Sequence, residues 1–591
     1  MRKPLRDTTS VTGTTRKVMG DGDGDEAEHG GGVDPAEARE RAAAGVAETY
    51  RRIKERGDDG VWITLRPEED VLADLDRLDP GGPLYGMTFA VKDNIDVAGL
   101  PTTAACPGYA YHPKRTAPLV KRLLAAGALL VGKTNLDQFA TGLSGTRSPY
   151  GACESPLAPG LIAGGSSSGS AVAVAAGLVD FAIGTDTAGS GRVPAAMTGT
   201  VGLKPSRGLV PTTGTVPACA SLDCPSVFAR TVAAGSAALT VMAGPYQDDP
   251  WSRDLPSPAP VAPGRGLRVA VPEHPDFLGD QGTEAGFAEA VARLRGLGHE
   301  IVPIDLGPFL AAGRLLYEGP WLAERIAAVG DFLAAHPDQV HPVTRRVLEP
   351  GTRITGADVF RGLHRLVELR AETARVLRDV DVLAVPTVPT TYTRAEMAAD
   401  PIVRNAHLGR YTNFCNLLDL AAVAVPAGTT PAGRPHGVTL MAPAGTDGLL
   451  AGLAAAFLAE PAPPDPADLT LLAVVGAHRT GHPLHPQLAA LGAVRHGLAH
   501  TAPAYRLHDL GDRPGMVRVE PGAPIEVELH RMTPEALGRL LVSIPPPLGL
   551  GTVELDDGRN VHGFLCEPYA LAGTPDITAH RSWPAYLASR G

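Results

Sequence analysis

The feature that most constrains the fold is an alternation of strand-like and helix-like segments along most of the chain. Short apolar runs at 87–91 and 128–131 flank a helical pattern at 118–126, and the alternation recurs from residue 267 to residue 385. Strands that alternate with helices are typical of a sheet covered by helices on both faces. We therefore predict an α/β fold with a mixed, mostly parallel sheet.

Composition divides the 591 residues into four parts. Residues 1–33 are rich in glycine and charge, so they cannot bury enough apolar surface to offset ordering entropy, and we predict disorder. Residues 34–459 form a large α/β domain. Residues 460–468 include four prolines in seven positions, which predicts a linker. Residues 469–591 change to strand patterns with one helix, which predicts a small α+β, barrel-like domain.

Charge and cysteine content exclude several classes of function. The chain has 53 Lys and Arg against 64 Asp and Glu and no dense basic stripe, so nucleic acid is not an expected partner. Its six cysteines form no CxxC pair, which argues against a disulfide framework or a zinc ribbon and favours the reducing cytoplasm. No apolar run approaches the ~18–20 residues that span a bilayer, so no membrane association is expected.

A dense cluster of glycine and serine occupies residues 164–170, and a second such loop follows at 184–192. Loops of this composition allow sharp turns with several backbone N–H groups pointing into one concavity. The first loop lacks the lysine of a phosphate-binding loop, but it matches a GxSxG nucleophile elbow around Ser167. On these residues alone, a flexible loop without chemistry is the favoured interpretation.

Lys92 ends an apolar strand and also has two interpretations. Such a lysine is commonly a group that extends to solvent or forms an ion pair. Alternatively, burial lowers its pKa and leaves a neutral amine that acts as a base. Local composition does not choose between them.

Several motifs in order along the chain resemble the amidase signature family: residues 91–94, 164–167, 184–186, 189–190 and 202–206, with Arg192 and Pro194. In that family the second serine follows the first by 24 residues, as Ser190 follows Ser166 here. The resemblance implies that Lys92 is the base, Ser166 a bridging serine with a cis peptide, and Ser190 the nucleophile. It also implies an oxyanion hole formed by the backbone N–H groups of Thr187, Ala188, Gly189 and Ser190. No cofactor or metal is expected.

The chemistry of amide cleavage is consistent with these roles. A free lysine with a pKa of ~10.4 is protonated at neutral pH, so burial must lower its pKa by ~2–3 units before it can accept a proton. One relay can then take the proton from Ser190 and return it to the leaving nitrogen. Asp186 and Arg192 flank the nucleophile, and we predict that they brace the loop.

Specificity is expected to depend on Tyr317 and Arg325, which are eight residues apart. They would share one helix face if Pro320 does not break the helix; otherwise Arg325 reads as an ordinary surface salt-bridge residue. The segment 316–325 resembles that of allophanate hydrolases, in which the matching tyrosine and arginine hold the substrate carboxylate. The resemblance therefore implies allophanate, a small planar anion, as the substrate, and an arginine fork is suited to its carboxylate.

The C-terminal domain resembles that of allophanate hydrolases at 474–478, 545–551 and 563–568. The resemblance implies a small barrel related to γ-glutamyl cyclotransferases that decarboxylates the first product. We predict His478 as its acid or base, with His530 and Glu528 as alternatives; a purely structural His478 is equally consistent. The spacing of His478, His482 and His485 is a weak metal pattern, because no carboxylate lies inside it and prolines interrupt it.

The sequence therefore predicts an amidase domain that hydrolyses allophanate to ammonia and carbon dioxide through an acyl-serine intermediate, in urea degradation. The resemblance implies a functional link to a biotin-dependent urea carboxylase and a homodimer. Two rivals remain. One is another small-amide amidase or the A-type subunit of an amidotransferase. The other treats the C-terminal domain as an assembly module without chemistry.

Overall fold

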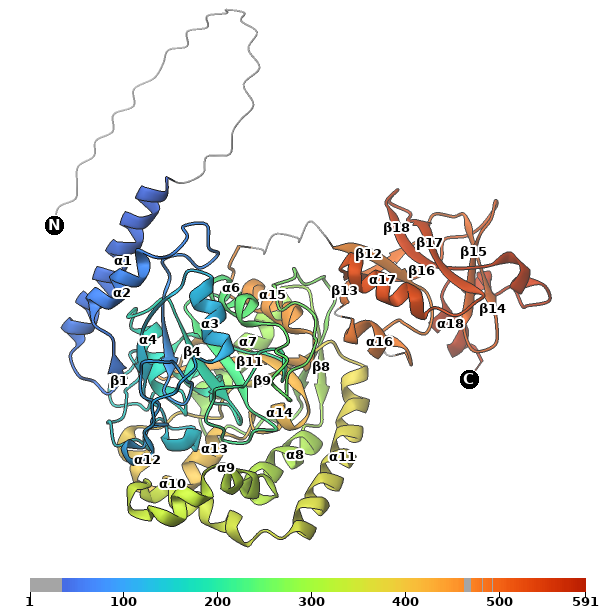
Figure 1. Cartoon of the computed structure of the whole chain (residues 1–591). Coiled ribbons are helices and arrows are strands. Elements are labelled where there is room, and N and C mark those ends of the chain that lie inside the picture. The colour runs from blue at the N-terminus through green and yellow to red at the C-terminus, as the bar shows by residue number, and fades with distance from the viewer. Residues whose placement is uncertain (1–33, 462–468, 481, 492, 591) are drawn as a thin grey trace, which may run out of the picture.

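A computed structural model describes residues 34–461, 469–480, 482–491 and 493–590 (Figure 1). The predicted disordered segment, 1–33, and most of the predicted linker, 462–468, lie outside the described residues. One sheet of eleven strands organises the larger part of the molecule, and a sheet of five strands organises the C-terminal part. The first helix starts where predicted, because the Asp34 carboxylate accepts a hydrogen bond from the Ala36 N–H at 3.0 Å.

The large sheet is mixed. In spatial order its strands are β1 (Trp62–Leu65), β3 (Leu129–Thr134), β2 (Thr88–Lys92), β4 (Phe181–Asp186), β6 (Cys224–Ala229), β5 (Val201–Lys204), β10 (Leu420–Thr429), β11 (Pro435–Pro443), β9 (Val382–Pro386), β7 (Arg268–Pro272) and β8 (Glu300–Ile304).

Parallel pairing in this sheet is confined to β3–β2–β4 and β9–β7–β8. Every pair from β4 to β9 through the centre is antiparallel, so the prediction of mostly parallel pairing is wrong there. The physical reason is visible at β10 and β11, which are joined by residues 430–434 alone. A connection this short allows a hairpin but not the crossover that parallel strands need.

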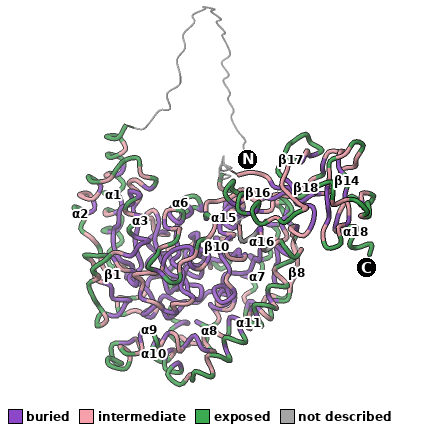
Figure 2. The backbone as a smooth tube through the Cα atoms, turned by 45° about the vertical axis from the view of Figure 1, so that its right-hand side comes forward, coloured by how far each residue is buried: buried purple, intermediate pink, exposed green. Residues whose placement is uncertain are grey.

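Helices cover both faces of the large sheet (Figures 1 and 2). Against one face pack α3 (Pro118–Ala125), α6 (Val232–Met242), α7 (Gln281–Gly296) and α15 (Asp447–Phe457). Against the other pack α4 (Ser168–Ala175), α5 (Val193–Thr198), α8 (Gly307–Glu318), α11 (Gly356–Arg378) and α14 (Phe414–Leu417). The remaining helices are α1 (Pro35–Arg56), α2 (Glu68–Leu75), α9 (Trp321–Ala335), α10 (Pro342–Leu348), α12 (Arg394–Ala399) and α13 (Val403–Leu408).

The alternation of side chains along β2 decides where Lys92 points. Phe89 and Val91 belong to the core beneath α3, α6 and α7, whereas Ala90 belongs to the core beneath α4. Because successive residues of a strand face opposite sides, Lys92 projects from the same face as Ala90. The fold therefore directs the amine towards the glycine- and serine-rich loop that precedes α4.

The C-terminal part is rich in strands, as predicted. Its five-stranded sheet has the order β13 (Val494–His500), β16 (Glu526–Met532), β12 (Thr470–Val474), β18 (Asn560–Cys566) and β17 (Leu548–Glu554). A bridge between Thr501 and Leu555 joins the ends of its two edge strands and gives it a barrel-like form. The other elements are β14 (Tyr505–Asp509), β15 (Pro514–Arg518), α16 (His485–Ala490), α17 (Pro534–Ser543) and α18 (Trp583–Ala588).

All six cysteines are buried, and none forms a disulfide with another described residue. Within the ranges that the structure describes, no helix combines the length and the apolar character needed to traverse a bilayer.

Candidate active site

Two loops meet at one edge of the large sheet. β2 and β4 are parallel neighbours, so the ends of both strands lie at the same edge. Lys92 closes β2, and the segment 187–192 leaves β4. The third contributor, Ser166, precedes α4, which packs on the same face of the sheet. Lys92 and Ser166 thus meet from separate elements, and Ser190 lies in the segment that leaves β4 at the same edge of the sheet.

Lys92 is fully buried, and its amine is held by hydroxyl groups alone. Its Nζ donates to Ser166 Oγ and to Thr185 Oγ1, each at 2.8 Å. No described carboxylate forms an ion pair with it, so Lys92 neither reaches solvent nor pairs with an acid. Burial lowers the pKa of Lys92 to about 7, although the carboxylates of Asp137, Asp223 and Asp186 act in the opposite direction. The amine is therefore substantially neutral near pH 7.

Ser166 follows a cis peptide bond from Gly165, as the family resemblance implies. Its side chain is buried, and its backbone oxygen accepts a hydrogen bond from the Asp137 N–H at 3.0 Å. The neighbouring Ser167 has another use: its hydroxyl donates to the Thr185 carbonyl oxygen at 3.1 Å. The elbow interpretation is therefore disfavoured, because the Ser167 hydroxyl ties α4 to β4.

Ser190 lies in a loop braced by a buried ion pair, as predicted. Arg192 donates from Nε and Nη2 to the two carboxylate oxygens of Asp186, at 2.8 and 2.9 Å. Asp186 also accepts the Gly191 N–H at 3.0 Å. Ser190 itself is only 2% exposed. A two-pronged pair with both members buried fixes the loop on either side of the serine hydroxyl.

Asn416 is a bracing residue that sequence reasoning missed. Its Nδ2 donates to the carbonyl oxygens of Asp186, Thr187 and Leu222, at 2.7, 3.1 and 2.9 Å. Its side chain therefore holds the backbone of the nucleophile loop from a position 226 residues beyond Ser190. No local motif signals this role, because the contact depends on the packing of α14.

The backbone N–H groups at the nucleophile loop are available to a ligand. None of the described residues accepts a hydrogen bond from the N–H of Thr187, Ala188, Gly189 or Ser190. Gly189 has φ +139°, and a Cβ there would meet Thr412 Oγ1 at 2.4 Å, so only glycine fits this turn. Several donors in one tight turn suit an oxyanion.

Tyr317 and Arg325 are brought together, although not on one helix. α8 ends at Glu318 and α9 begins at Trp321, so Pro320 does break the helix and the shared-face geometry is wrong. Arg325 Nη2 nevertheless lies 3.5 Å from Tyr317 Oη, and its guanidinium lies 5.3 Å from the ring centre. Arg325 is 1% exposed, and no described carboxylate forms a salt bridge with it, which excludes a surface salt bridge.

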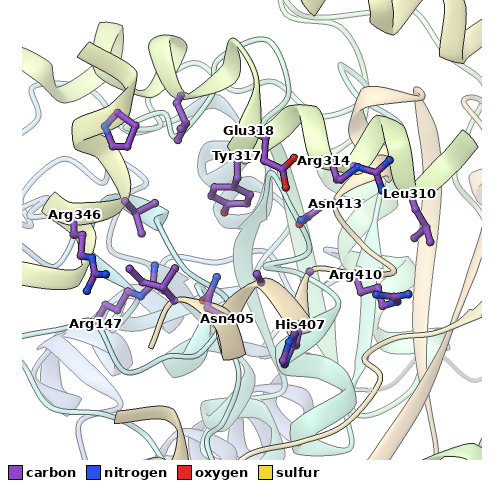
Figure 3. A pocket seen from close by; sticks show the side chains of 17 residues that line it. Arg147, Leu310, Arg314, Tyr317, Glu318, Arg346, Asn405, His407, Arg410 and Asn413 are labelled. Carbon is purple, nitrogen blue, oxygen red and sulfur yellow. The ribbon is translucent and has the colours of Figure 1, made fainter. Parts of the chain in front are cut away.

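A cavity of about 520 Å³ opens beside Tyr317 (Figure 3). Asn405 lines it and accepts a hydrogen bond from the Leu143 N–H at 2.8 Å, while the Leu143 carbonyl accepts one from the Gly165 N–H at 2.8 Å. Lys92 and Ser190 do not line the cavity. Its wall is linked to the loop of Ser166 by the hydrogen bonds that join Asn405, Leu143 and Gly165. Its charged lining residues are Arg147, Arg314, Glu318, Arg346 and Arg410.

The predicted C-terminal residues lie together but differ in their surroundings. His478 stacks on Phe564 with ring centres 4.9 Å apart, and its Nε2 lies 3.0 Å from Gln487 Oε1. Burial lowers the pKa of His478. Glu528 and His530 form a separate buried pair, with Glu528 Oε1 2.8 Å from His530 Nε2.

His485, Glu528 and His530 place possible ligand atoms within 4.8 Å of one another. The carboxylate of Glu528 is already occupied, because it accepts the Thr480 N–H at 2.9 Å and lies 3.3 Å from Arg495 Nε. A guanidinium so close to the carboxylate opposes a divalent cation. The donor set therefore fits a metal poorly, and the absence of a metal stays a prediction.

Comparisons with known proteins identify the family of each domain. The sequence model of the amidase family matches residues 50–451, and that of the allophanate hydrolase C-terminal domain matches residues 470–588. The urea amidolyase of Lachancea kluyveri is 41% identical over 576 residues, which cover 90% of this chain and 32% of that protein. The Saccharomyces cerevisiae urea amidolyase is 40% identical over 90% of this chain and 31% of its own length. The chain thus spans about a third of these relatives.

A solved structure similar to the whole chain is the Kluyveromyces lactis allophanate hydrolase. It is 36% identical, with a TM-score of 0.71, and the match covers 95% of this chain and 100% of that one. The 2-amino-5-chloromuconic acid deaminase of Comamonas testosteroni is 35% identical over 66% of this chain and 86% of its own length. With its lysine, two serines and braced loop on the large mixed sheet, the chain belongs to the amidase family of enzymes that act on C–N bonds, and it has the domain architecture of allophanate hydrolases.

Proposed function

We propose that this chain hydrolyses allophanate, urea-1-carboxylate, and that Ser190, Ser166 and Lys92 carry the reaction. The observation that carries the substrate assignment is Arg325, a guanidinium that is 1% exposed and lacks a carboxylate partner among the described residues. A buried cation without a counterion is costly unless a ligand supplies the negative charge. Tyr317, whose hydroxyl faces this guanidinium, adds a neutral donor for the same anion.

In the first half-reaction, Ser190 Oγ attacks the terminal carbamoyl carbon of allophanate. Its proton passes through the Ser166 hydroxyl to the neutral amine of Lys92, which already contacts Ser166. The negative charge on the carbonyl oxygen is stabilised by the N–H groups of residues 187–190. The relay then returns the proton to the terminal nitrogen, the C–N bond breaks, and ammonia leaves an acyl-Ser190.

In the second half-reaction, water takes the place of ammonia. Lys92 and Ser166 accept a proton from the water as its oxygen attacks the acyl carbon, and the Ser190–acyl bond breaks as Ser190 recovers a proton. The product is N-carboxycarbamate. Its decarboxylation and hydrolysis yield the remaining ammonia and two molecules of carbon dioxide.

Steady-state rates on allophanate, biuret and acetamide test this proposal. Biuret is the matched neutral control, because an amide replaces the carboxylate of allophanate. Allophanate should be preferred over both neutral amides, and Arg325→Ala should lower its kcat/KM by about 100-fold, as expected for loss of a buried charged hydrogen bond. Equal rates on neutral amides would instead favour an amidase of broader specificity or an amidotransferase subunit.

We further propose that the C-terminal domain promotes decarboxylation of N-carboxycarbamate, with His478 as its acid or base. The match to the allophanate hydrolase C-terminal domain and the lowered pKa of His478 support this role. In full-length His478→Ala, carbon dioxide release should lag behind ammonia release. A domain that serves only assembly would leave the two releases synchronous in this variant.

The functional link to a urea carboxylase, the homodimer and the cytoplasmic location remain proposals of the same kind. The urea amidolyases that the chain resembles extend over about three times its length, which supports a partner enzyme that supplies allophanate. The unpaired cysteines are consistent with a reducing compartment. Sedimentation equilibrium of the purified chain tests the dimer directly, and a single monomeric mass would reject it.

A further inference from the structure

A second buried arginine lies beside the residues assigned to the substrate carboxylate. Arg147 is 2% exposed and lines the same cavity as Tyr317 (Figure 3). Thr141 connects it to Arg325: the Thr141 carbonyl accepts from Arg147 Nη1 at 2.9 Å, and the Thr141 hydroxyl accepts from Arg325 Nη1 at 3.1 Å. One residue therefore accepts hydrogen bonds from both guanidinium groups.

The loop that presents Thr141 has an unusual backbone. Phe139 and Ala140 adopt φ +52° and +51°, a left-handed conformation that is uncommon for residues with a side chain. Such conformations persist where the surrounding structure enforces them, and they cluster at binding and active sites. Here the turn directs both acceptors of Thr141 to arginines.

Neither guanidinium has a contacting carboxylate among the described residues, and the acidic groups nearest them act without contact: Asp137 on Arg147, and Asp223 and Glu324 on Arg325. The remaining polar contact of the Arg147 side chain is Nη2 to the Pro401 carbonyl at 2.9 Å, and no described carboxylate forms a salt bridge with Arg147 or Arg325. The Nε of each is buried and has no hydrogen-bond partner. The nearby Asp137 carboxylate accepts the backbone N–H groups of Gly145 and Arg147 rather than a guanidinium.

We propose that Arg147 is a specificity-determining residue, the second cation of a paired-arginine seat that selects amides bearing a carboxylate. The identity of the substrate rests on the proposed function. The inference itself concerns only the preference for amides that bear a carboxylate. Arg325 and Tyr317 hold the carboxylate, and Arg147 adds a second positive charge from the cavity side. A neutral amide of the same shape gains nothing from that charge and leaves two buried cations uncompensated.

The seat is tested by binding as well as by turnover. Malonamate replaces the central nitrogen of allophanate by carbon and keeps its carboxylate, and malonamide is its neutral counterpart. Calorimetry in a Ser190→Ala background avoids hydrolysis of either compound. Arg147→Gln should weaken malonamate binding about 10- to 100-fold and change malonamide binding less than about 3-fold. Arg147→Lys, which keeps the charge, should retain most of the preference for malonamate.

Arg346→Gln is the matched control, because Arg346 lines the same cavity but is exposed. Its effect on malonamate should stay within about 2-fold. Equal losses for malonamate and malonamide in Arg147→Gln would make Arg147 a structural brace for Thr141 and Pro401 and overturn the proposal. An equal loss in Arg346→Gln would overturn it too, since a diffuse positive potential would then suffice.

Turnover separates this inference from the proposed function. If the wild type hydrolyses allophanate and Arg147→Gln keeps the wild-type ratio of kcat/KM for allophanate to that for biuret, the function stands and the seat fails. If the wild type does not hydrolyse allophanate but binds malonamate in an Arg147-dependent manner, the seat stands and another carboxylated amide is the substrate. If malonamate does not bind at all, the seat is rejected.

Discussion

In the large domain Lys92, Arg147 and Arg325 are buried without an ion pair to any described residue, whereas in the C-terminal domain Glu528 is buried among partners. Glu528 accepts hydrogen bonds from Thr480 and from His530 and lies 3.3 Å from Arg495 Nε. Arg495 also donates to the Gly266 carbonyl at 2.6 Å, so this cluster reaches the large domain. A buried charged group with hydrogen-bond and ion-pair partners stabilises the local structure, whereas a buried ionisable group without an ion pair is a candidate for binding a ligand or exchanging a proton.

We interpret this difference as one between residues that hold the structure and residues that we propose take part in chemistry. In the large domain an ion pair is present where a loop must be rigid, at Asp186 and Arg192. Among the described residues it is missing at Lys92, Arg147 and Arg325, the residues that we propose transfer the proton or bind the substrate. Glu528 in the C-terminal domain resembles Asp186, because both are buried carboxylates with ion-pair and hydrogen-bond partners. His478 is the exception there, since its neighbours are a phenyl ring and an amide.

The largest expected effect comes from removing the neutral amine. Lys92→Met should lower kcat for allophanate by about 10⁴-fold, because Ser190 then has no base, in line with losses of single members of serine-based relays. Thermal unfolding should show no loss of stability, because the variant replaces a desolvated amine by an apolar chain. A rate within 10-fold of wild type would remove Lys92 from the chemistry.

A large stability effect is expected for the satisfied cluster. Glu528→Gln should destabilise the C-terminal domain by about 2 kcal/mol, because Arg495 loses the nearer of its two carboxylate partners, at 3.3 Å, and keeps only Asp381 at 3.8 Å. Arg325→Met in the large domain should change stability by less than about 1 kcal/mol, since no partner charge is abandoned. Chemical denaturation measures the free energy of unfolding of both variants. Comparable decreases would contradict the proposed difference between charged groups with partners and those without.

The sequence predicted those parts of the site that are carried by local motifs. The roles of Lys92 and the two serines follow from the resemblance to the amidase signature family, including its 24-residue spacing, and the strands and turns that carry them form where expected. Arg147 and Asn416 were not assigned roles, because their contacts depend on packing between distant segments. Burial of Arg325 likewise follows from how α8 and α9 fold back after Pro320, which periodicity alone does not determine.

The fold shows the same limit. Alternating patterns identified β2, β3 and the strands between residues 267 and 385, but not the antiparallel centre of the sheet, because pairing direction depends on which strands become neighbours. In the C-terminal domain β13, Val494–His500, was not predicted, since two histidines and a glycine interrupt any apolar alternation. Its partner β16 supplies the register through six paired positions.

The activity of the large domain should depend on pH, with a change in kcat/KM of about tenfold, whereas the stability contribution of Glu528 in the C-terminal domain should not change over the same pH range. With a pKa of about 7 for Lys92, the neutral fraction, and hence kcat/KM for allophanate, should rise about tenfold from pH 6 to pH 8. Because the unfolded chain keeps the lysine protonated up to about 10.5, folding stability should also rise with pH above 7.

Glu528 should behave in the opposite way. Burial acts to raise its pKa, but hydrogen bonds from His530 and Thr480 outweigh it and hold the pKa well below the ordinary value. Its contribution to stability is therefore complete above the unfolded value of 4.5 and is lost only as the pH falls through the lowered pKa. Denaturation midpoints of the C-terminal domain between pH 6 and 8 should show no change attributable to Glu528.

The smallest effect is expected inside the active site itself, at Ser167. Its hydroxyl donates a hydrogen bond to the Thr185 carbonyl. Because this donor already has a partner, we expect Ser167 to have a structural role although it adjoins Ser166. Ser167→Ala should cost about 1 kcal/mol of stability through the lost hydrogen bond and change kcat less than about 3-fold. Ser166→Ala is the matched control, because it breaks the relay one position away and should lower kcat at least about 100-fold. Equal losses in the two variants would return Ser167 to the list of candidate nucleophiles and would refute the view that a side chain with a satisfied hydrogen bond takes no part in the chemistry.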